Sequence, residues 1–194
     1  MHKVIKKNNI AFYIVSLLLL TTSCSSSIEN RVKAFHKAAN GNNADRLLAF
    51  YAEDVRFEIV GTPMVIEGKE NLRKPIEEQI VLNHKLTFTD IEINGNTATS
   101  KVKEQNDMLK AAGIDAIYYE YDQITFEDGL IKQERAKPTP ESMEIMGEFR
   151  RSFEKWASEN KAEEWAKLKA EGITEENADS WLTMTRQWRE EMEK

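Results

Sequence analysis

The sequence predicts an α+β fold in which helices pack on an antiparallel sheet, followed by a helical C-terminal extension. A helical pair leads into a strand between Arg31 and Gly68. Asn94-Gly95 and Asp128-Gly129 are hairpin signals between runs of strand-forming residues. Beyond Pro138-Thr139-Pro140 the apolar period becomes helical. A chain of 194 residues, 41% of them apolar, suits one domain with an attachment.

Apolar periodicity places the elements along residues 31–137. Pro75 lies inside the third helix, where it removes an amide donor, so we expect that helix to start late or bend. Leu86 and Phe88 share one parity while Ile91 and Ile93 share the other, which predicts a bulge near Thr89-Asp90 and a curved sheet. The expected elements are helices ending at Asn40-Gly41, at Phe50 and near Leu82, strands over 55–59, 64–66, 85–93, 97–106, 117–126 and 130–137, and a loop or single helical turn over 107–113.

The C-terminal extension, residues 138–194, is expected to form a helical hairpin. Its first helix ends at Gly172, and the second begins after Thr174. All four tryptophans lie here, and Phe149, Phe153 and Trp156 share one apolar stripe on the first helix. Such a stripe packs on its own domain, or it forms a docking surface for a partner or for lipid headgroups.

The N-terminus has the pattern of a secretory signal, residues 1–23. Three lysines precede an apolar run from Ile10 to Leu20, and small residues lead to Cys24. The run is too short for a permanent span, which needs about 20 apolar residues.

Cys24 is the only cysteine, so no intramolecular disulfide is expected. Its place after the signal resembles the lipobox of bacterial lipoproteins, although Thr21 stands where those motifs prefer leucine. The resemblance implies a lipidated Cys24, residues 24–27 as a tether, and a protein held on the bacterial cell envelope, facing the periplasm or the exterior. Ordinary cleavage that leaves a free thiol is the alternative.

The charge balance argues against nucleic acid as a partner. The chain has 27 Lys and Arg against 33 Asp and Glu, a formal charge of −6. Without residues 1–23, which hold three lysines and no acid, the charge is −9. Nucleic-acid binding depends on basic residues that neutralise phosphates, and no basic cluster is present.

Residues 31–68 also carry a family resemblance. The helical pair is followed by Tyr51-Ala-Glu-Asp-Val-Arg-Phe-Glu-Ile59, an Ala-Glu-Asp turn that delivers the chain onto a strand. This resembles the entry to the nuclear transport factor 2-like (NTF2-like) fold in its SnoaL-like branch. The resemblance covers residues 28–137 and implies a cone of three helices and a curved sheet around one pocket.

Ketosteroid isomerase, an enzyme of this superfamily, uses a Tyr, an Asp base and a protonated late-strand Asp in its pocket. Laid on this chain, those positions fall at Phe35, Ile59 and Asp122. Phe35 has no hydrogen to donate and Ile59 takes no proton. Only Asp122 is retained, so the isomerase set is incomplete.

Limonene epoxide hydrolase is the second enzyme for comparison. Its strand motif resembles the stretch from Glu104 to Leu109, in which Asp107 keeps the first Asp of an Asp-Arg-Asp triad and Gln105 replaces the Arg. Ala136 stands near the second Asp. The Tyr and Asn that position water fall at Phe57 and Ile59. This set is also incomplete.

Asp107 is the best polar candidate by sequence. Pointing inward beside Phe57, it would have a raised pKa and act as a general acid or base. Alternatively, Asn106-Asp107 caps the short turn before Gly113. His36 and His84 are expected at the surface, because no Cys or carboxylate pairs at ligand spacing accompany them. No metal and no cofactor is expected.

Three functions remain open. The first is binding of a small, partly apolar, neutral or cationic molecule in a pocket lined by Phe35, Phe57, Ile59, Gln105, Asp107 and Asp122. The second is a hydrolase or isomerase that uses Asp107. The third is a protein-interaction module that forms a homodimer through the sheet face and recruits a partner with its helical extension.

Overall fold

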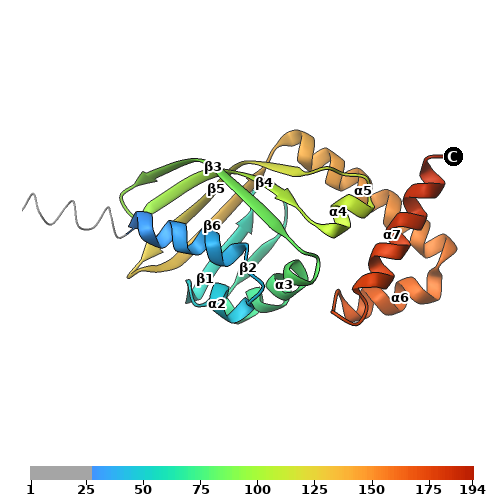
Figure 1. Ribbon diagram of the computed structural model, residues 1–194, viewed down its shortest axis with the longest axis horizontal. Helices are drawn as coiled ribbons and strands as arrows, with labels where there is room; N and C mark the ends of the chain where they lie inside the picture. Colours follow the sequence, from blue (N-terminus) through green and yellow to red (C-terminus); the bar gives the residue numbers. More distant parts are fainter. Residues whose placement is uncertain (1–27) are drawn as a thin grey trace, which may run out of the picture.

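The computed structural model describes residues 28–194. The predicted signal and Cys24 lie outside these residues. One helix over residues 28–39 precedes the labelled elements of Figure 1. These are α2 (Ala44–Leu48), β1 (Tyr51–Ile59), β2 (Val65–Glu67), α3 (Lys69–Val81), β3 (Lys85–Asn94), β4 (Thr97–Gln105), α4 (Asp107–Ala111), β5 (Ile117–Glu127), β6 (Leu130–Pro138), α5 (Pro140–Asn160), α6 (Ala162–Glu171) and α7 (Ala178–Met192).

The six strands form one sheet in the order β2-β1-β6-β5-β4-β3. The predicted α+β fold is therefore confirmed, with one pairing that differs from expectation. β1 lies parallel to β6, while all other neighbours are antiparallel. This pairing places the first strand of the domain one position in from the edge of the sheet, beside the last strand.

The sheet is curved by breaks in its strand pairing. The predicted bulge near Thr89-Asp90 is confirmed by a register shift between Thr89 and Glu92, and Asp90 has a φ of 50°. Further shifts occur in β4–β5 and at two places in β5–β6. Each bulge increases the local twist, so the sheet bends around the helices on its concave face.

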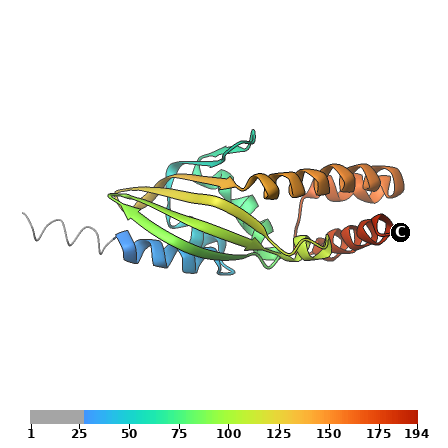
Figure 2. The same cartoon turned by 90° about the horizontal axis from the view of Figure 1, so that it is seen from above.

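The main core lies between that face and the first helix, α2 and α3. Phe35 is 2% exposed, and its ring meets those of Phe50 and Tyr51 edge-on at 5.8 and 5.9 Å. The first helix runs along one face of the sheet (Figure 1, Figure 2). Pro75 lies inside α3, which begins at Lys69, directly after Gly68, so the helix does not start late.

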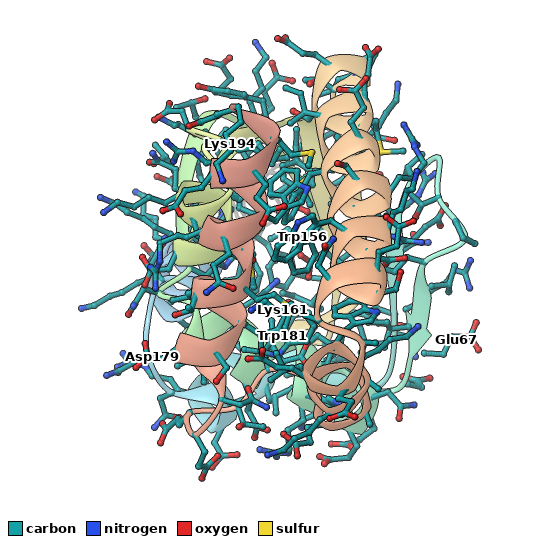
Figure 3. The ribbon with its side chains drawn as sticks, turned by 90° about the vertical axis from the view of Figure 1, so that its right-hand side faces the viewer. Glu67, Trp156, Lys161, Asp179, Trp181 and Lys194 are labelled. Carbon is teal, nitrogen blue, oxygen red and sulfur yellow. The ribbon has the colours of Figure 1, made fainter. Side chains whose placement is uncertain are left out.

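The C-terminal extension forms three helices, where a hairpin of two was predicted. The first expected helix breaks at Lys161, whose φ and ψ are −139° and 36°. The break lets Trp165 meet Phe153 and Trp181, each with ring centroids 5.6 Å apart. Trp156 and Trp181 lie between the helices of the extension (Figure 3). No Gly or Pro marks this break, so tertiary packing determines it.

The extension packs on the domain at two places. α7 lies against α4, where the Thr185 hydroxyl contacts the Met108 sulfur at 3.1 Å. The α6–α7 connection meets α3, where the amide of Ile173 donates to Glu78 at 3.4 Å. The aromatic side chains of the extension thus pack within their own chain, with Phe153, Trp156 and Trp188 buried and Phe149, Trp165 and Trp181 partly buried. In the part of the chain that the structure describes, no helix combines the length and apolar character needed to cross a bilayer.

Candidate functional site

A cavity of about 370 Å³ opens into the cone between the helices and the concave face of the sheet. Most of its wall is apolar, contributed by the first helix, α2, α3, α5 and all six strands. Met64 and Met146 line it and are 45% and 37% exposed, so its mouth lies between the β1–β2 turn and the start of α5. The apolar lining includes Phe35, Phe57, Ile59, Leu72, Ile76, Leu86, Phe88, Val102 and Ile117.

Two carboxyl groups, Asp122 of β5 and Glu134 of β6, form the carboxyl pair of this cavity. Asp122 stands opposite Ala136, and Glu134 stands opposite Ile124. The two acids are therefore diagonal neighbours on one face of adjacent strands. The hydroxyl of Tyr51 donates to Oε2 of Glu134 at 2.6 Å, while Oδ1 of Asp122 is buried without a hydrogen-bond partner.

Burial sets the protonation of the carboxyl pair. It raises the pKa of Glu134 to about 7, against the lowering effect of the Tyr51 hydroxyl. Burial also raises the pKa of Asp122 well above its ordinary value, and the neighbouring charge of Glu134 raises it further. Because two like charges in a dry site do not ionise together readily, the pair retains a proton at pH values where exposed carboxyls have lost theirs.

A second polar group, the Glu104 cluster, consists of Glu104, His84 and Tyr119. The Tyr119 hydroxyl donates to Oε2 of Glu104 at 2.6 Å, and Asn106 donates to Oε1 at 3.2 Å. Nε2 of His84 lies 3.2 Å from that same Oε1. Burial raises the pKa of Glu104, but the contacts with His84, Tyr119 and Asn106 together outweigh it, so the pKa is lowered.

The cavity therefore holds two acidic groups in opposite electrostatic states. The carboxyl pair favours the protonated form, whereas Glu104 favours the ionised form. Such an arrangement is able to offer a proton at one place and accept one at another. Among residues 28–194, no three His, Cys, Asp or Glu side chains are grouped as ligands for a metal ion.

Four of the six residues expected in the pocket line the cavity: Phe35, Phe57, Ile59 and Asp122. Gln105 and Asp107 do not. They line a separate hollow with Lys85 and Lys110.

Gln105 follows Glu104 on β4, so alternation turns it to the opposite face, where it donates to the carbonyl of Asp115 at 3.1 Å. Asp107 is the first residue of α4, capped by the Asn106 side chain, and accepts from Asn83 at 2.6 Å. Of the two expectations for this stretch, the structure agrees with the second, in which it caps the short turn before Gly113.

The sequence interpretation missed Tyr51, His84, Glu104, Tyr119 and Glu134. Glu104 carried a usable signal, because it shares the parity of Ala98, Ser100 and Val102, all of which are buried. The expectation of a surface histidine at position 84 is wrong, since its side chain is 6% exposed.

Glu134 gave a misleading signal. Counted from the buried Ile131, strict alternation turns Glu134 outward. The register shifts in β5–β6 between Thr125 and Phe126, and in β1–β6 before Arg56. These irregularities reverse the parity and bring Glu134 to the cavity, and no pattern in the sequence announces them.

The comparisons with known proteins agree with this fold. The family model of the SnoaL-like domain matches residues 32–134. The comparison with curated proteins finds no significant match. A comparison with solved structures finds many similar chains, at low sequence identity.

One similar structure is an LEH-like epoxide hydrolase of M. tuberculosis, with 16% identity, a TM-score of 0.52, and coverage of 62% of this chain and 88% of that one. A second is the epoxide hydrolase/cyclase-like enzyme SalBIII of pyran ring formation in salinomycin, with 14% identity, a TM-score of 0.54, and coverage of 61% and 95%. A third is an NTF2-like protein of unknown function from Burkholderia xenovorans LB400, with 14% identity, a TM-score of 0.50, and coverage of 60% and 85%.

At these identities the structural likeness shows the fold alone. The family match covers more than half of the chain, and its last residue is Glu134, so it includes every residue of the carboxyl pair and the Glu104 cluster. The chain therefore belongs to the SnoaL-like domain family, and its fold is NTF2-like.

Proposed function

We propose that this protein binds a small, partly apolar molecule in the cone cavity. The observation that carries the proposal is a cavity of about 370 Å³ with apolar walls and a few convergent polar groups. Ligand pockets in proteins have this size range and this composition. Phe35 and Ile59 line it at the positions where ketosteroid isomerase keeps its Tyr and its base, which favours binding over that enzyme's reaction.

Charge substitutions in the apolar wall test this proposal. Phe57→Asp and Ile59→Lys place an ion in the apolar cavity, so we expect both to abolish binding. Native mass spectrometry of the purified protein would report a small molecule that co-purifies with the unaltered chain. Ile91→Lys is the matched control, because Ile91 is 46% exposed and does not line the cavity. A molecule retained equally by both cavity variants would place the binding site elsewhere.

The site of action that we propose is the bacterial cell envelope, with the protein held there by a lipid on Cys24. The signal-like pattern before Cys24 supports this. The first helix begins at the end of the domain opposite the C-terminal helices (Figure 1), so a tether at residues 24–27 leaves those helices pointing away from the membrane. Cys24→Ser should move the protein from the membrane fraction to the soluble fraction, as read by fractionation and immunoblotting.

A second candidate function is acid–base catalysis in the same cavity. It is favoured by the opposite pKa shifts of the carboxyl pair and Glu104. Asp107, the candidate from sequence, lies outside the cavity and is replaced in this role by Glu104 as acceptor and Glu134 as donor. A proton shift in an enolisable ketone is the simplest reaction of this kind.

Deuterium incorporation tests this second candidate. Incubation of enolisable ketones with the protein in D2O, followed by mass spectrometry, should show exchange that Glu104→Gln removes. Asp107→Asn is the control and should leave the exchange unchanged. Exchange at the rate of the protein-free solution with every ketone would contradict catalysis and leave the binding function in place.

A further inference from the structure

The charge inside the cone cavity has one sign. Among residues 28–194, the lining contains three carboxyl groups, those of Glu104, Asp122 and Glu134, and no lysine or arginine. The one basic side chain that these residues contribute to the lining, His84, is already in contact with Glu104. An anionic ligand would thus enter a cavity that offers three acids and no free cation.

One acid of the cavity lacks a partner. Asp122 is 7% exposed, and its Oδ1 has no hydrogen-bond donor. Its neighbour Glu134 receives one donor, the Tyr51 hydroxyl, on Oε2. A buried acceptor without a donor is unfavourable, and native structures rarely leave one without a reason. A ligand that brings hydrogen-bond donors to this place would satisfy it.

Aromatic groups adjoin the carboxyl pair. Phe57 stands opposite Glu134 in the β1–β6 pairing and lines the same cavity. Carboxylates beside aromatic faces are the combination that binds alkylammonium groups, because charge and ring quadrupole both attract the cation. A metal ion is a poorer fit, since no grouping of ligands for one exists among the described residues.

We propose that the ligand of this cavity is a small organic cation, an amine whose ammonium group sits at the carboxyl pair and whose apolar body lies against Phe57 and Ile59. This rests on the proposed binding function and narrows it to one chemical class. The ammonium donates hydrogen bonds to Asp122 and Glu134, and the apolar wall covers the remainder of the molecule.

Proton release accompanies this binding. In the empty cavity the pair retains a proton; when R–NH3⁺ enters, a carboxyl O–H bond breaks, the proton passes to water, and a carboxylate–ammonium pair remains. The other titratable groups of the site are Tyr51 on β1, Tyr119 on β5 and the pair Glu104 and His84. Burial raises the pKa of both tyrosines, so their hydroxyls stay neutral.

Isothermal titration calorimetry with three matched probes tests the proposal on the full chain. The probes are 2-phenylethylamine, 2-phenylethanol and phenylacetate, which share one ring and differ in charge. We expect the amine to bind at least tenfold more tightly than the alcohol, and phenylacetate to show no binding. Titration in buffers of different ionisation enthalpy should show about one proton released per amine at pH 6, and amine affinity should fall about tenfold per pH unit below that.

Two variants complete the test. Asp122→Asn keeps the shape of the side chain and removes its charge. It should therefore weaken binding of the amine at least tenfold and leave the affinity for 2-phenylethanol unchanged. Asp107→Asn, in the separate hollow, should change neither affinity. Circular dichroism checks that each variant is folded. The comparison of the three probes on the unaltered chain does not depend on the variants.

The outcomes separate the inference from the function on which it rests. Equal affinity for amine and alcohol, or tighter binding of phenylacetate than of the amine, would overturn the proposal of a cationic ligand. Either result would still show that the cavity binds small molecules. Absence of binding by all three probes would contradict both.

Discussion

Glu134 shows how a residue's surroundings reverse its ordinary behaviour. Its carboxyl is buried between strands, so the protonated form is favoured and its pKa rises to about 7. In the unfolded chain the same group titrates near 4.5. Between these values the folded state binds more protons than the unfolded state, so the contribution of Glu134 to stability is full below about pH 4.5 and is lost as pH rises through about 7.

Glu134→Gln should therefore change the pH dependence of stability. The variant keeps an acceptor for Tyr51 but has no ionisable group. Relative to the unaltered chain, its free energy of unfolding should rise between pH 5 and pH 7, by about 1.4 kcal/mol per pH unit at most. Urea unfolding at several pH values measures this difference. A difference between the two proteins that stays constant with pH would contradict the assigned burial of Glu134.

His36 should affect the pH dependence of stability in the opposite direction to Glu134. Its ring stacks on Phe88 with centroids 3.7 Å apart, and burial lowers its pKa to about 4. Its contribution to stability is present above about pH 6.5 and is lost as pH falls through about 4. His36→Phe keeps a ring on Phe88 without a titrating group. The stability of this variant relative to the unaltered chain should thus rise as pH falls from 6.5 to 4. Thermal unfolding at several pH values measures this difference. If both proteins lost stability equally over this range, His36 would not be the cause of the pH dependence.

At the scale of the element, Asn106 links a helix cap to the cavity. Its side-chain oxygen accepts from the amide of Leu109 at 2.8 Å, and its amide donates to Glu104 at 3.2 Å. α4, which it caps, supports α7. One residue therefore serves the polar cluster on β4 and the attachment of the C-terminal helices.

Two substitutions separate these roles of Asn106. Asn106→Ala removes both bonds and should lower the free energy of unfolding by about 1 kcal/mol. Asn106→Ser retains a cap acceptor and loses the donor to Glu104, so it should recover most of that stability. Urea denaturation compares them. Equal losses in the two variants would mean that the cap contributes nothing.

The elements also show what the sequence was able to predict. Most strand bounds and both hairpins follow from alternation and turn residues, and positive φ values at Gly95, Asp128 and Gly129 agree with those turns. Alternation did not predict which side chains of β5 and β6 face the cavity, because register shifts reverse the parity along these strands. The cavity-facing Asp122 was placed by resemblance, whereas Glu134 depended on a bulge that only the assembled sheet determines.

At the scale of the whole molecule, the C-terminal extension braces two walls of the cavity. The start of α5 contributes Met143 and Met146 to the lining, while the α6–α7 connection contacts Glu78 of α3, another lining helix. The C-terminal extension therefore contributes to one wall of the cavity and contacts a second.

Deletion of residues 139–194 should expose the cavity and the face of α4 to water. We expect a protein of low solubility that binds the dye ANS, because apolar surface now covered by the extension becomes accessible. A soluble truncated protein that instead loses a co-purifying protein would favour the docking role. Light scattering on the full chain tests the predicted homodimer through the sheet face, which stays a prediction.

The parallel contact between β1 and β6 has a consequence for how the chain matures. Tyr51 and Glu134 meet across 83 positions, so this contact in the cavity wall is among the most distant in sequence within residues 28–194. Distant pairings form slowly, because a long loop must close before they stabilise anything. A polypeptide still emerging from the ribosome therefore has no finished chamber until its last strand and the start of α5 have been made. Chaperones and proteases have that interval in which to act on the unfinished protein.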